Sequence, residues 1–394
     1  MLRRPALTAA LALLAASAHA QLSWNPHVRE VADFVLAQQN QRGCIPDAPE
    51  GLRANEAGAM GRSLLAAAYA WRTLSRLPYR NAWREGIKWL AVSMERGTQW
   101  DGTWRYAYAG KPPHVPLPSS PDGIAHDARG LTSAAGLFAY HVALYVHFTA
   151  DETVSNACRP HVQAALDFVL EKNRGRNHLF YRGWYQPKEK GTDAWELCRK
   201  QYATDQADLL LGLWAGSWLV GHARYRIAAE RLEREIGDRL FDKRHRAFGI
   251  ALDEAGSLIP PAEDVETHVV QGYLTWVLGL TKETEQAMKW LDARLAPDGS
   301  FRRRRSDPAP VLPAAAFCLG ASRVAAYSDE MRKTRRWLRD YAVAPKGGVR
   351  ALAAPDASTR NDLAGWVILA WLGPDPRPFT RPLDKPAHSL VPIK

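Results

Sequence analysis

The stretch YATDQADLLLGLWA, residues 202–215, places two carboxylates, Asp205 and Asp208, ahead of a run that is apolar on almost every side. The run continues to residue 221 and is rich in Ala, Gly, Leu and Trp. Its length and composition predict a helix. Because a helix that is apolar all round has no face for solvent, it must be buried in protein. The stretch therefore predicts a helix in the interior of a larger helical assembly.

Similar segments recur along the chain and alternate with segments of a second kind. The apolar set comprises residues 56–75, 130–149, 205–221, 264–280, 310–327 and 358–373. The other set has one apolar stripe and a charged face, and comprises residues 25–41, 80–96, 152–173, 223–242, 281–296 and 328–344. Six buried helices alternating with six amphipathic ones predict an all-α fold of six hairpins, closed into an inner and an outer ring. We expect this (α/α)6 toroid to span residues 21–373.

The connections between the two sets differ strongly in length. Those from an inner to an outer helix are short, as at residues 150–151. Those from an outer to an inner helix are long, and each has Gly near an aromatic or β-branched residue, as in DGTWRYAYAG at residues 101–110. This pattern predicts a turn with a short strand in each long loop. Long loops gathered at one end of a rigid scaffold are where we expect binding and chemistry.

The two ends of the chain have compositions of their own. Two arginines, a short apolar run and an A-x-A site give residues 1–20 the pattern of a signal peptide. We therefore expect export to the periplasm or the medium after cleavage between Ala20 and Gln21. No later stretch reaches the ~20 consecutive apolar residues of a membrane span. Residues 374–394 form a Pro-rich tail.

The chain carries a formal net charge of +11 and four cysteines. For an exported protein, a basic surface attracts acidic glycans or lipid headgroups before nucleic acid, or it simply keeps the protein soluble. We expect no nucleic-acid partner. The spacing of the cysteines fits no zinc motif. The cysteines could form up to two disulfides or remain buried free thiols. We expect neither a metal nor a cofactor. The cysteines are Cys44, Cys158, Cys198 and Cys318.

Acidic residues gather where the inner helices are expected to begin. Asp205 and Asp127 are each followed at once by apolar helix, which places them on the rim of the central cavity, and Asp208 and Glu56 are alternates. Each could instead cap its helix. Glycoside hydrolysis needs a carboxylic acid that protonates the leaving oxygen and a second carboxylate that activates water or attacks the sugar. We expect Asp205 to be the proton donor and Asp127 its partner.

The long loops are also rich in side chains that suit a sugar. Flat rings hold sugars by apolar stacking, and a basic side chain could bind the carboxylate of a uronic acid. Each of these side chains could instead pack the loops onto the toroid. The residues expected to bind a polysaccharide or oligosaccharide, with or without uronic acids, are Asn55, Trp104, Tyr106, His126, Trp184, Tyr185, Trp195, Tyr202, His268 and Arg302.

Twelve alternating helices with carboxylates at the inner-helix starts resemble the six-hairpin glycosidase superfamily, whose members are (α/α)6 barrels acting mostly on polysaccharides and oligosaccharides. Two short motifs are similar to those of the unsaturated uronyl hydrolases within it. The sequence HDARG at residues 126–130 resembles the H-D-x-G-like stretch that carries one catalytic aspartate. The helix opening at Asp205 resembles the one that carries the other. The resemblance thus implies catalysis by Asp127 and Asp205.

Three alternatives to an exported glycoside hydrolase stay open. A toroid of this kind could bind glycans without cleaving them. A polysaccharide lyase on the same scaffold would rely on Tyr, His and Arg. The stretches FVLAQQNQRG at 34–43 and WLDARLAPDGSF at 290–301 resemble the glutamine-containing repeats of terpenoid cyclases and protein prenyltransferases, which are also toroids. Against that resemblance, the sequence has no D-x-D-D or D-D-x-x-D run.

Overall fold

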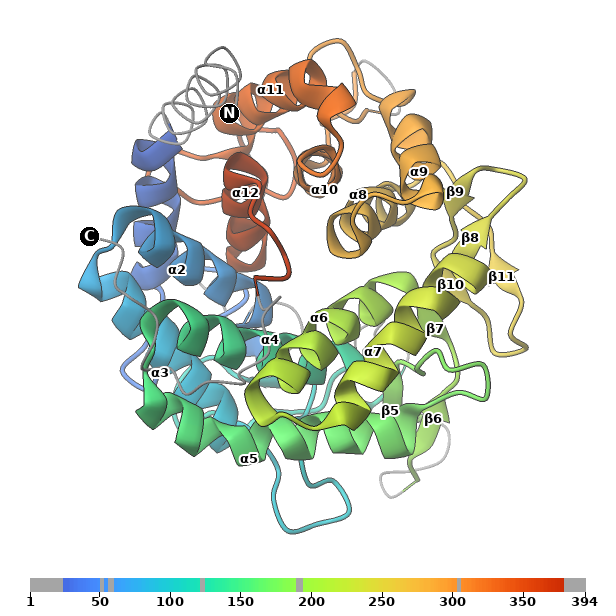
Figure 1. Ribbon diagram of the computed structural model, residues 1–394. Helices are drawn as coiled ribbons and strands as arrows, with labels where there is room; N and C mark the ends of the chain where they lie inside the picture. Colours follow the sequence, from blue (N-terminus) through green and yellow to red (C-terminus); the bar gives the residue numbers. More distant parts are fainter. Residues whose placement is uncertain are drawn as a thin grey trace, which may run out of the picture.

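The computed structural model describes residues 24–49, 53–55, 60–120, 125–188, 194–302 and 306–378. Its helices form two concentric rings, with the inner helices around a common axis (Figure 1). The inner helices are α2 (Gly61–Leu74), α4 (Thr132–Thr149), α6 (Ala203–Val220), α8 (Val265–Leu278), α10 (Val311–Ala321) and α12 (Asn361–Leu372). Each inner helix packs against the next, and α12 packs against α2, which closes the ring.

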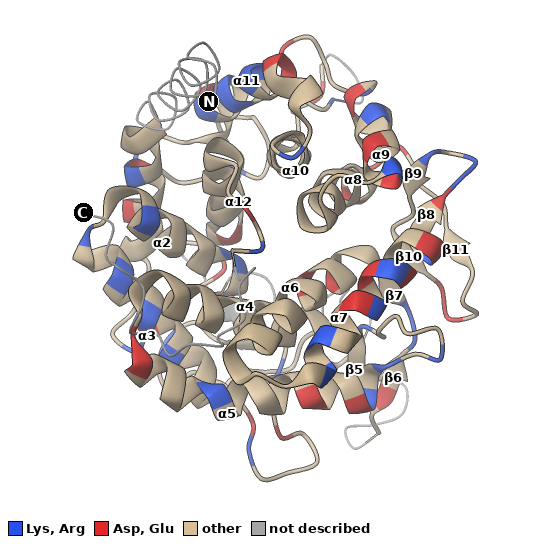
Figure 2. Cartoon of the chain, viewed as in Figure 1, with Lys and Arg blue, Asp and Glu red and all other residues tan. Residues whose placement is uncertain are grey.

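The outer ring is made of the amphipathic segments. It comprises a helix over residues 24–37, α3 (Leu77–Ser93), α5 (Glu152–Phe168), α7 (Ala223–Glu235), α9 (Lys282–Asp292) and α11 (Ser328–Trp337). Single π-helical turns extend α5, α7 and α11, and they are η2 (Val169–Asn173), η3 (Ile236–Leu240) and η5 (Leu338–Ala342). A short 3₁₀ turn, η4 (Ala325–Tyr327), precedes α11. Charged side chains lie mainly on these outer helices and on loops (Figure 2). The predicted (α/α)6 toroid and its alternation are confirmed.

Glycines explain how closely three pairs of inner helices approach. A Cβ atom at Gly136 of α4 would meet the backbone of α6, and one at Gly212 would meet the backbone of α4. The pair α8 and α10 meets in the same way at Gly272 and Gly320, and Gly365 of α12 lies against the backbone of α2. Without a side chain, glycine lets two backbones come within contact distance. These contacts make the inner wall tight enough to hold side chains at its rim.

The strands lie in the long connections that lead to α2, α4, α6 and α8. The described residues of the connections to α10 and α12 have only isolated bridges, so the predicted strand in each long loop is confirmed in four of the six. They form three-stranded antiparallel sheets in the orders β1-β2-β3, β4-β5-β6 and β7-β10-β11, and a hairpin β8-β9. Their bounds are β1 (Arg53–Asn55), β2 (Ala107–Ala109), β3 (Pro116–Leu117), β4 (Asp127–Arg129), β5 (Gly183–Gln186), β6 (Glu196–Cys198), β7 (Gln201–Tyr202), β8 (Phe241–Asp242), β9 (Ala247–Phe248), β10 (Ala251–Leu252) and β11 (Leu258–Ile259). The loops therefore form a structured rim at the N-terminal ends of the inner helices.

The expected signal peptide and most of the expected tail lie outside the described residues. The described start of the tail is tied to the ring, because the Trp276 indole donates to the Pro374 carbonyl at 2.8 Å and Arg377 pairs with Glu233 at 3.1 Å. All four cysteines are free thiols, and three of them are buried. No helix among the described residues is long and apolar enough to cross a membrane.

Candidate functional site

The centre of the ring holds a cavity of about 340 Å³ at the N-terminal ends of the inner helices. Five of the six inner helices contribute to it, α4 being the exception. We call it the central cavity; its lining residues are Arg62, Thr204, Val265, Glu266, Val269, Leu312, Asp362, Leu363 and Trp366. Such a mixture of apolar walls and a few polar groups is typical of sites that orient a small ligand.

Asp205 stands beside this cavity, in the first turn of α6. The residue is only 7% exposed, and burial raises the pKa of its carboxyl to about 6. Its Oδ2 has no hydrogen-bond partner among the described residues, and the nearest cation, Arg182, is 3.8 Å away. A buried carboxyl without a close cation keeps its proton to higher pH than usual. Asp205 can therefore hold a proton closer to neutral pH than an exposed aspartate does. Its role as the proton donor stays a prediction.

Asp208, one turn further along α6, has a different environment. It is fully buried, accepts a 3.0 Å hydrogen bond from Arg62 and accepts another, of 2.5 Å, from the Tyr273 hydroxyl. The Arg62 guanidinium also stacks on Trp366, 4.8 Å from the ring centroid. Both carboxyl oxygens of Asp208 thus have hydrogen-bond partners, and Asp208 holds Arg62 at the wall of the cavity. This environment suits the structural role that the sequence analysis leaves open for Asp208.

Two further carboxylates line the central cavity. Glu266, in the first turn of α8, is open to solvent on the cavity side, and burial by the surrounding protein raises its pKa. Asp362, in the first turn of α12, accepts two hydrogen bonds of 2.9 Å from Arg360, which balance its charge. The electrostatic neighbours of Asp205 are Arg182, Asp208, Arg62 and Glu266. Glu266 is therefore the cavity-lining carboxylate that is also an electrostatic neighbour of Asp205.

Asp127 belongs to a separate cluster in the sheet β4-β5-β6. It is 2% exposed, pairs with Arg105 and accepts a 2.8 Å hydrogen bond from the backbone of Ala128. Glu95 lies 3.4 Å from Arg105 and 3.3 Å from Arg129. The four charges balance one another. No described contact joins Asp127 to Asp205. Because the two carboxylates of a glycosidase lie several ångströms apart, their pairing stays a prediction.

The predicted sugar-binding aromatics occupy very different positions. Trp104 is 2% exposed, donates to the Leu90 carbonyl at 2.7 Å and packs on Phe138, so it is a core side chain. The sequence assigned it to the cleft because a Trp in a loop motif looks the same whether the loop turns it inward or outward. Tyr185 is buried as well. Neither ring presents a platform for a sugar.

The remaining rings are only partly buried. Trp195 covers Arg129 at 4.5 Å and contacts Trp100, and Trp184 donates to Asn173 at 3.1 Å. These rings pack the rim onto the Asp127 cluster. Tyr202, whose ring stacks on Arg182 at 4.3 Å, lies next to Asp205. The residues Tyr106 and His126 are half-buried and exposed, respectively.

Some predicted residues fall at the edge of what the structure describes. Glu56 and the arginines 303–305 lie outside the described residues. Asn55 ends β1, where it pairs with Ala107. Arg302 is exposed and pairs with Asp298.

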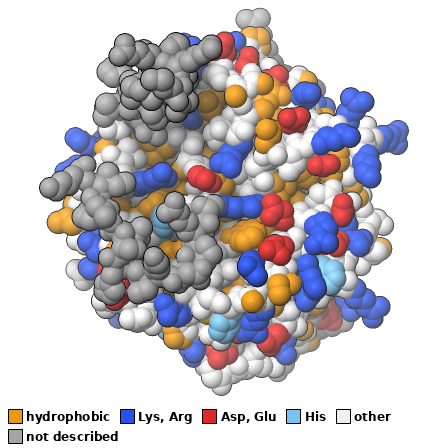
Figure 3. Space-filling model, viewed as in Figure 1, with side chains coloured by type: hydrophobic (Ala, Val, Ile, Leu, Met, Phe, Trp, Pro, Cys, Tyr) orange, Lys and Arg blue, Asp and Glu red, His pale blue; other side chains and the backbone are white. Residues whose placement is uncertain are grey.

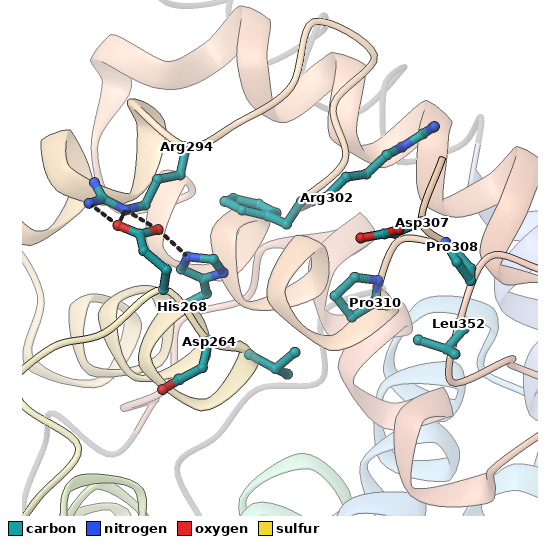
Figure 4. A pocket seen from close by; sticks show the side chains of 11 residues that line it. Asp264, His268, Arg294, Arg302, Asp307, Pro308, Pro310 and Leu352 are labelled. Carbon is teal, nitrogen blue, oxygen red and sulfur yellow. Dashed lines mark hydrogen bonds and ion pairs between the residues drawn. The ribbon is translucent and has the colours of Figure 1, made fainter. Parts of the chain in front are cut away.

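His268 and Arg302 line a second cavity of about 740 Å³, which we call the outer cavity (Figure 4). It lies between the start of α8, the end of α9 and the loop that leads to α10. Val265 lines both cavities, so they adjoin. The lining residues are Glu263, Asp264, Val265, His268, Arg294, Phe301, Arg302, Asp307, Pro308, Pro310 and Leu352.

Charges on the described part of the face in Figure 3 are mixed, with acidic and basic side chains interspersed. No group of acidic, His and Cys side chains that could hold a metal ion occurs among the residues that the structure describes. Sequence reasoning missed Arg62 and Trp366 because neither belongs to a motif, and it noted Glu266 and Asp362 only as acidic helix starts. The position of Glu266 and Asp362 in the first turn of inner helices is the signal that could have selected these two residues.

Comparisons with known proteins bear on the fold. No protein family model matches the chain, and no curated protein matches it. Among solved structures, a cellobiose 2-epimerase from Spirochaeta thermophila is similar at 15% identity and a TM-score of 0.64, over 89% of this chain and 97% of that one. A GH76 α-mannanase from Bacteroides thetaiotaomicron is similar at 12% identity and a TM-score of 0.60, over 89% and 94%.

A glycosidase solved in complex with glucose is similar at 12% identity and a TM-score of 0.61, over 90% of this chain and 98% of that one. Likeness at such low identity concerns the fold and leaves the reaction open. The chain thus has the (α/α)6 toroid fold, which these glycosidases and sugar epimerases also have.

Proposed function

We propose that this protein is a glycoside hydrolase that cleaves a glycan in the central cavity, with Asp205 as the proton donor. The observation that carries the proposal is the state of Asp205. A carboxyl that is 7% exposed, has a pKa of about 6 and leaves Oδ2 unpartnered is suited to protonate a leaving oxygen. The general acid of a glycosidase needs these properties.

Glu266 is the proposed second carboxylate, which activates water or attacks the sugar. It lines the central cavity, is an electrostatic neighbour of Asp205 and is exposed, so a water or a sugar can reach it. Asp362 also lines the cavity, but Arg360 engages both of its oxygens. Asp127 is engaged by Arg105 in the rim. Glu266 therefore replaces Asp127 as our first choice for this role.

Arg62 and Trp366 would hold the reacting sugar. Asp208 orients the guanidinium of Arg62, and Trp366 supplies the apolar wall on which Arg62 stacks. Preorganised donors of this kind need no rearrangement when the substrate binds. Export of the protein stays part of the proposal and rests on the pattern of residues 1–20, so the expected substrate is an extracellular or cell-surface glycan.

The test is a screen of the mature chain on neutral and uronic polysaccharides, followed by reducing-end release and absorbance at a wavelength where unsaturated products absorb. We expect new reducing ends without an unsaturated product, and their loss in Asp205→Asn and Glu266→Gln. Unsaturated products would identify a lyase, and a product of unchanged chain length would identify an isomerase. Affinity for a glycan without any product would identify a binding protein. Full activity of both variants would contradict the assignment of the two residues.

A further inference from the structure

The outer cavity has no role in the proposed chemistry, although it is the larger of the two. Its volume of about 740 Å³ falls within the ~300–1,000 Å³ typical of small-molecule sites. Through Val265 it shares a wall with the central cavity. The two cavities are therefore neighbours on either side of Val265.

One wall of the outer cavity carries a histidine whose Nε2 has only a distant polar neighbour. The His268 side chain is 13% exposed, and its Nε2 lies 3.8 Å from Glu263 with no hydrogen-bond partner among the described residues. The ring is held between Trp290 at 5.7 Å and Phe301 at 5.3 Å. Burial lowers the pKa of His268, so the ring is neutral at pH 7 and can exchange a hydrogen bond with a hydroxyl group.

The opposite side carries apolar side chains beside two charged ones. Figure 4 shows His268 and Arg294 on one side of the hollow, and on the other Pro308, Pro310 and Leu352 together with Arg302 and Asp307. Leu352 is 41% exposed and Val265 is 44% exposed, and both line the cavity. A ligand that covers exposed apolar side chains in a cavity binds more tightly, because it removes their surface from water. A cavity that combines polar groups with exposed apolar side chains suits a sugar ring, which has hydroxyl groups at its edge and C–H groups on its faces.

The charges of the outer cavity argue against an acidic ligand. Arg294 donates to both oxygens of Glu263 at 2.9 and 3.0 Å, and Arg302 pairs with Asp298. The described lining residues include three carboxylates, those of Glu263, Asp264 and Asp307, against these two guanidinium groups. A uronate would meet cations that are already paired and would add another negative charge.

We propose that the outer cavity is a second sugar subsite that binds a neutral hexose unit, so that the substrate spans at least two sugar units across Val265. This inference rests on the proposed function of the central cavity. In it, His268 exchanges a hydrogen bond with a sugar hydroxyl, and Leu352 covers one face of the ring. At this position the proposal favours a neutral sugar over a uronic acid, a choice that the sequence analysis leaves open.

The test is calorimetric titration of the full chain carrying Asp205→Asn. The probes are glucose, cellobiose and cellotriose, then mannose and its disaccharide and trisaccharide, then galacturonate and digalacturonate. In at least one neutral series we expect the disaccharide to bind roughly tenfold more tightly than the monosaccharide. We expect no such gain from galacturonate to digalacturonate.

Two variants test which residues cause the tighter binding of the disaccharide. His268→Leu and Leu352→Ser should each reduce it about three- to tenfold while leaving monosaccharide affinity unchanged. Leu280→Ser is the matched control, because Leu280 is 59% exposed and follows the C-terminal end of α8, away from both cavities. Its affinities should equal those of the parent chain.

Several results would overturn the inference. They are equal affinity for monosaccharide and disaccharide, absence of binding by every neutral probe, a larger gain for digalacturonate, or a gain that survives both variants. The proposed function fails by a different measurement, namely full reducing-end release by Asp205→Asn. A chain-length gain in binding would remain if only the assignment of Asp205 were wrong.

Discussion

Asp205 and Asp127 are two buried aspartates at the same end of the toroid, and their surroundings differ in one respect. Asp127 is paired with Arg105 and accepts a hydrogen bond from the Ala128 backbone. Asp205 has a cation no closer than 3.8 Å and an oxygen without a partner, and burial raises its pKa to about 6. Burial alone therefore does not make a proton donor. The two aspartates differ in how fully their carboxyl oxygens are partnered.

The largest effect that separates the two aspartates is expected in activity. Asp205→Asn keeps the shape of the side chain but removes the proton donor, and it should lower kcat by about 10²- to 10⁴-fold. Asp127→Asn, the matched control, should change kcat less than tenfold. Reducing-end release on the glycan identified by the screen measures both. The comparison breaks down if Asp127→Asn is the more damaging substitution.

A second difference concerns the arginine that pairs with a buried aspartate in each region, Arg62 with Asp208 and Arg105 with Asp127. Arg62→Met leaves Asp208 fully buried and without its cation, which should cost about 3–5 kcal/mol of unfolding free energy. Denaturant unfolding, followed by far-UV circular dichroism, measures the loss. Arg62→Lys, which keeps the charge, should recover part of it. A loss below about 1 kcal/mol would mean that Asp208 is neutral and needs no partner.

The pH dependence of stability sharpens the comparison further. The pKa of Asp205 is raised in the folded state from 3.8 to about 6. Its contribution to the free energy of unfolding is therefore fully present below about pH 4 and is lost as the pH rises through 6. Between pH 4 and 7 the parent chain should lose about 2–3 kcal/mol relative to Asp205→Asn. Unfolding of both chains at each pH gives this difference. Parallel curves would show that Asp205 ionises without cost.

The smallest expected effect is at the rim. Arg105→Met removes the partner of Asp127, but the Ala128 hydrogen bond remains and Arg105 is itself 31% exposed. We expect a loss of about 1–2 kcal/mol in unfolding free energy. The same unfolding experiment measures it, with Arg96→Met as the control for an exposed arginine of the same rim. A loss as large as that of Arg62→Met would show that the two clusters depend equally on their arginines for stability.

The sequence was sufficient for the fold because periodicity is a local property. The inner helix predicted over 205–221 is α6, and the outer helix predicted over 281–296 contains α9. The site depends on pairs that are distant in the chain. Arg62 meets Asp208 across 146 residues, and nothing near either residue in the sequence signals the pair. For the same reason, Asp127 could not be recognised as a paired residue before Arg105 was placed beside it.

The dependence of kcat/KM on pH tests the central claim most directly. If Asp205 must be protonated to act, kcat/KM on the identified glycan should fall above an apparent pKa near 6, in the parent chain and in Asp127→Asn alike. The residual activity of Asp205→Asn should lack this fall. A profile that stays flat from pH 5 to 8, or an unchanged fall in Asp205→Asn, would contradict the assignment of Asp205 as the proton donor.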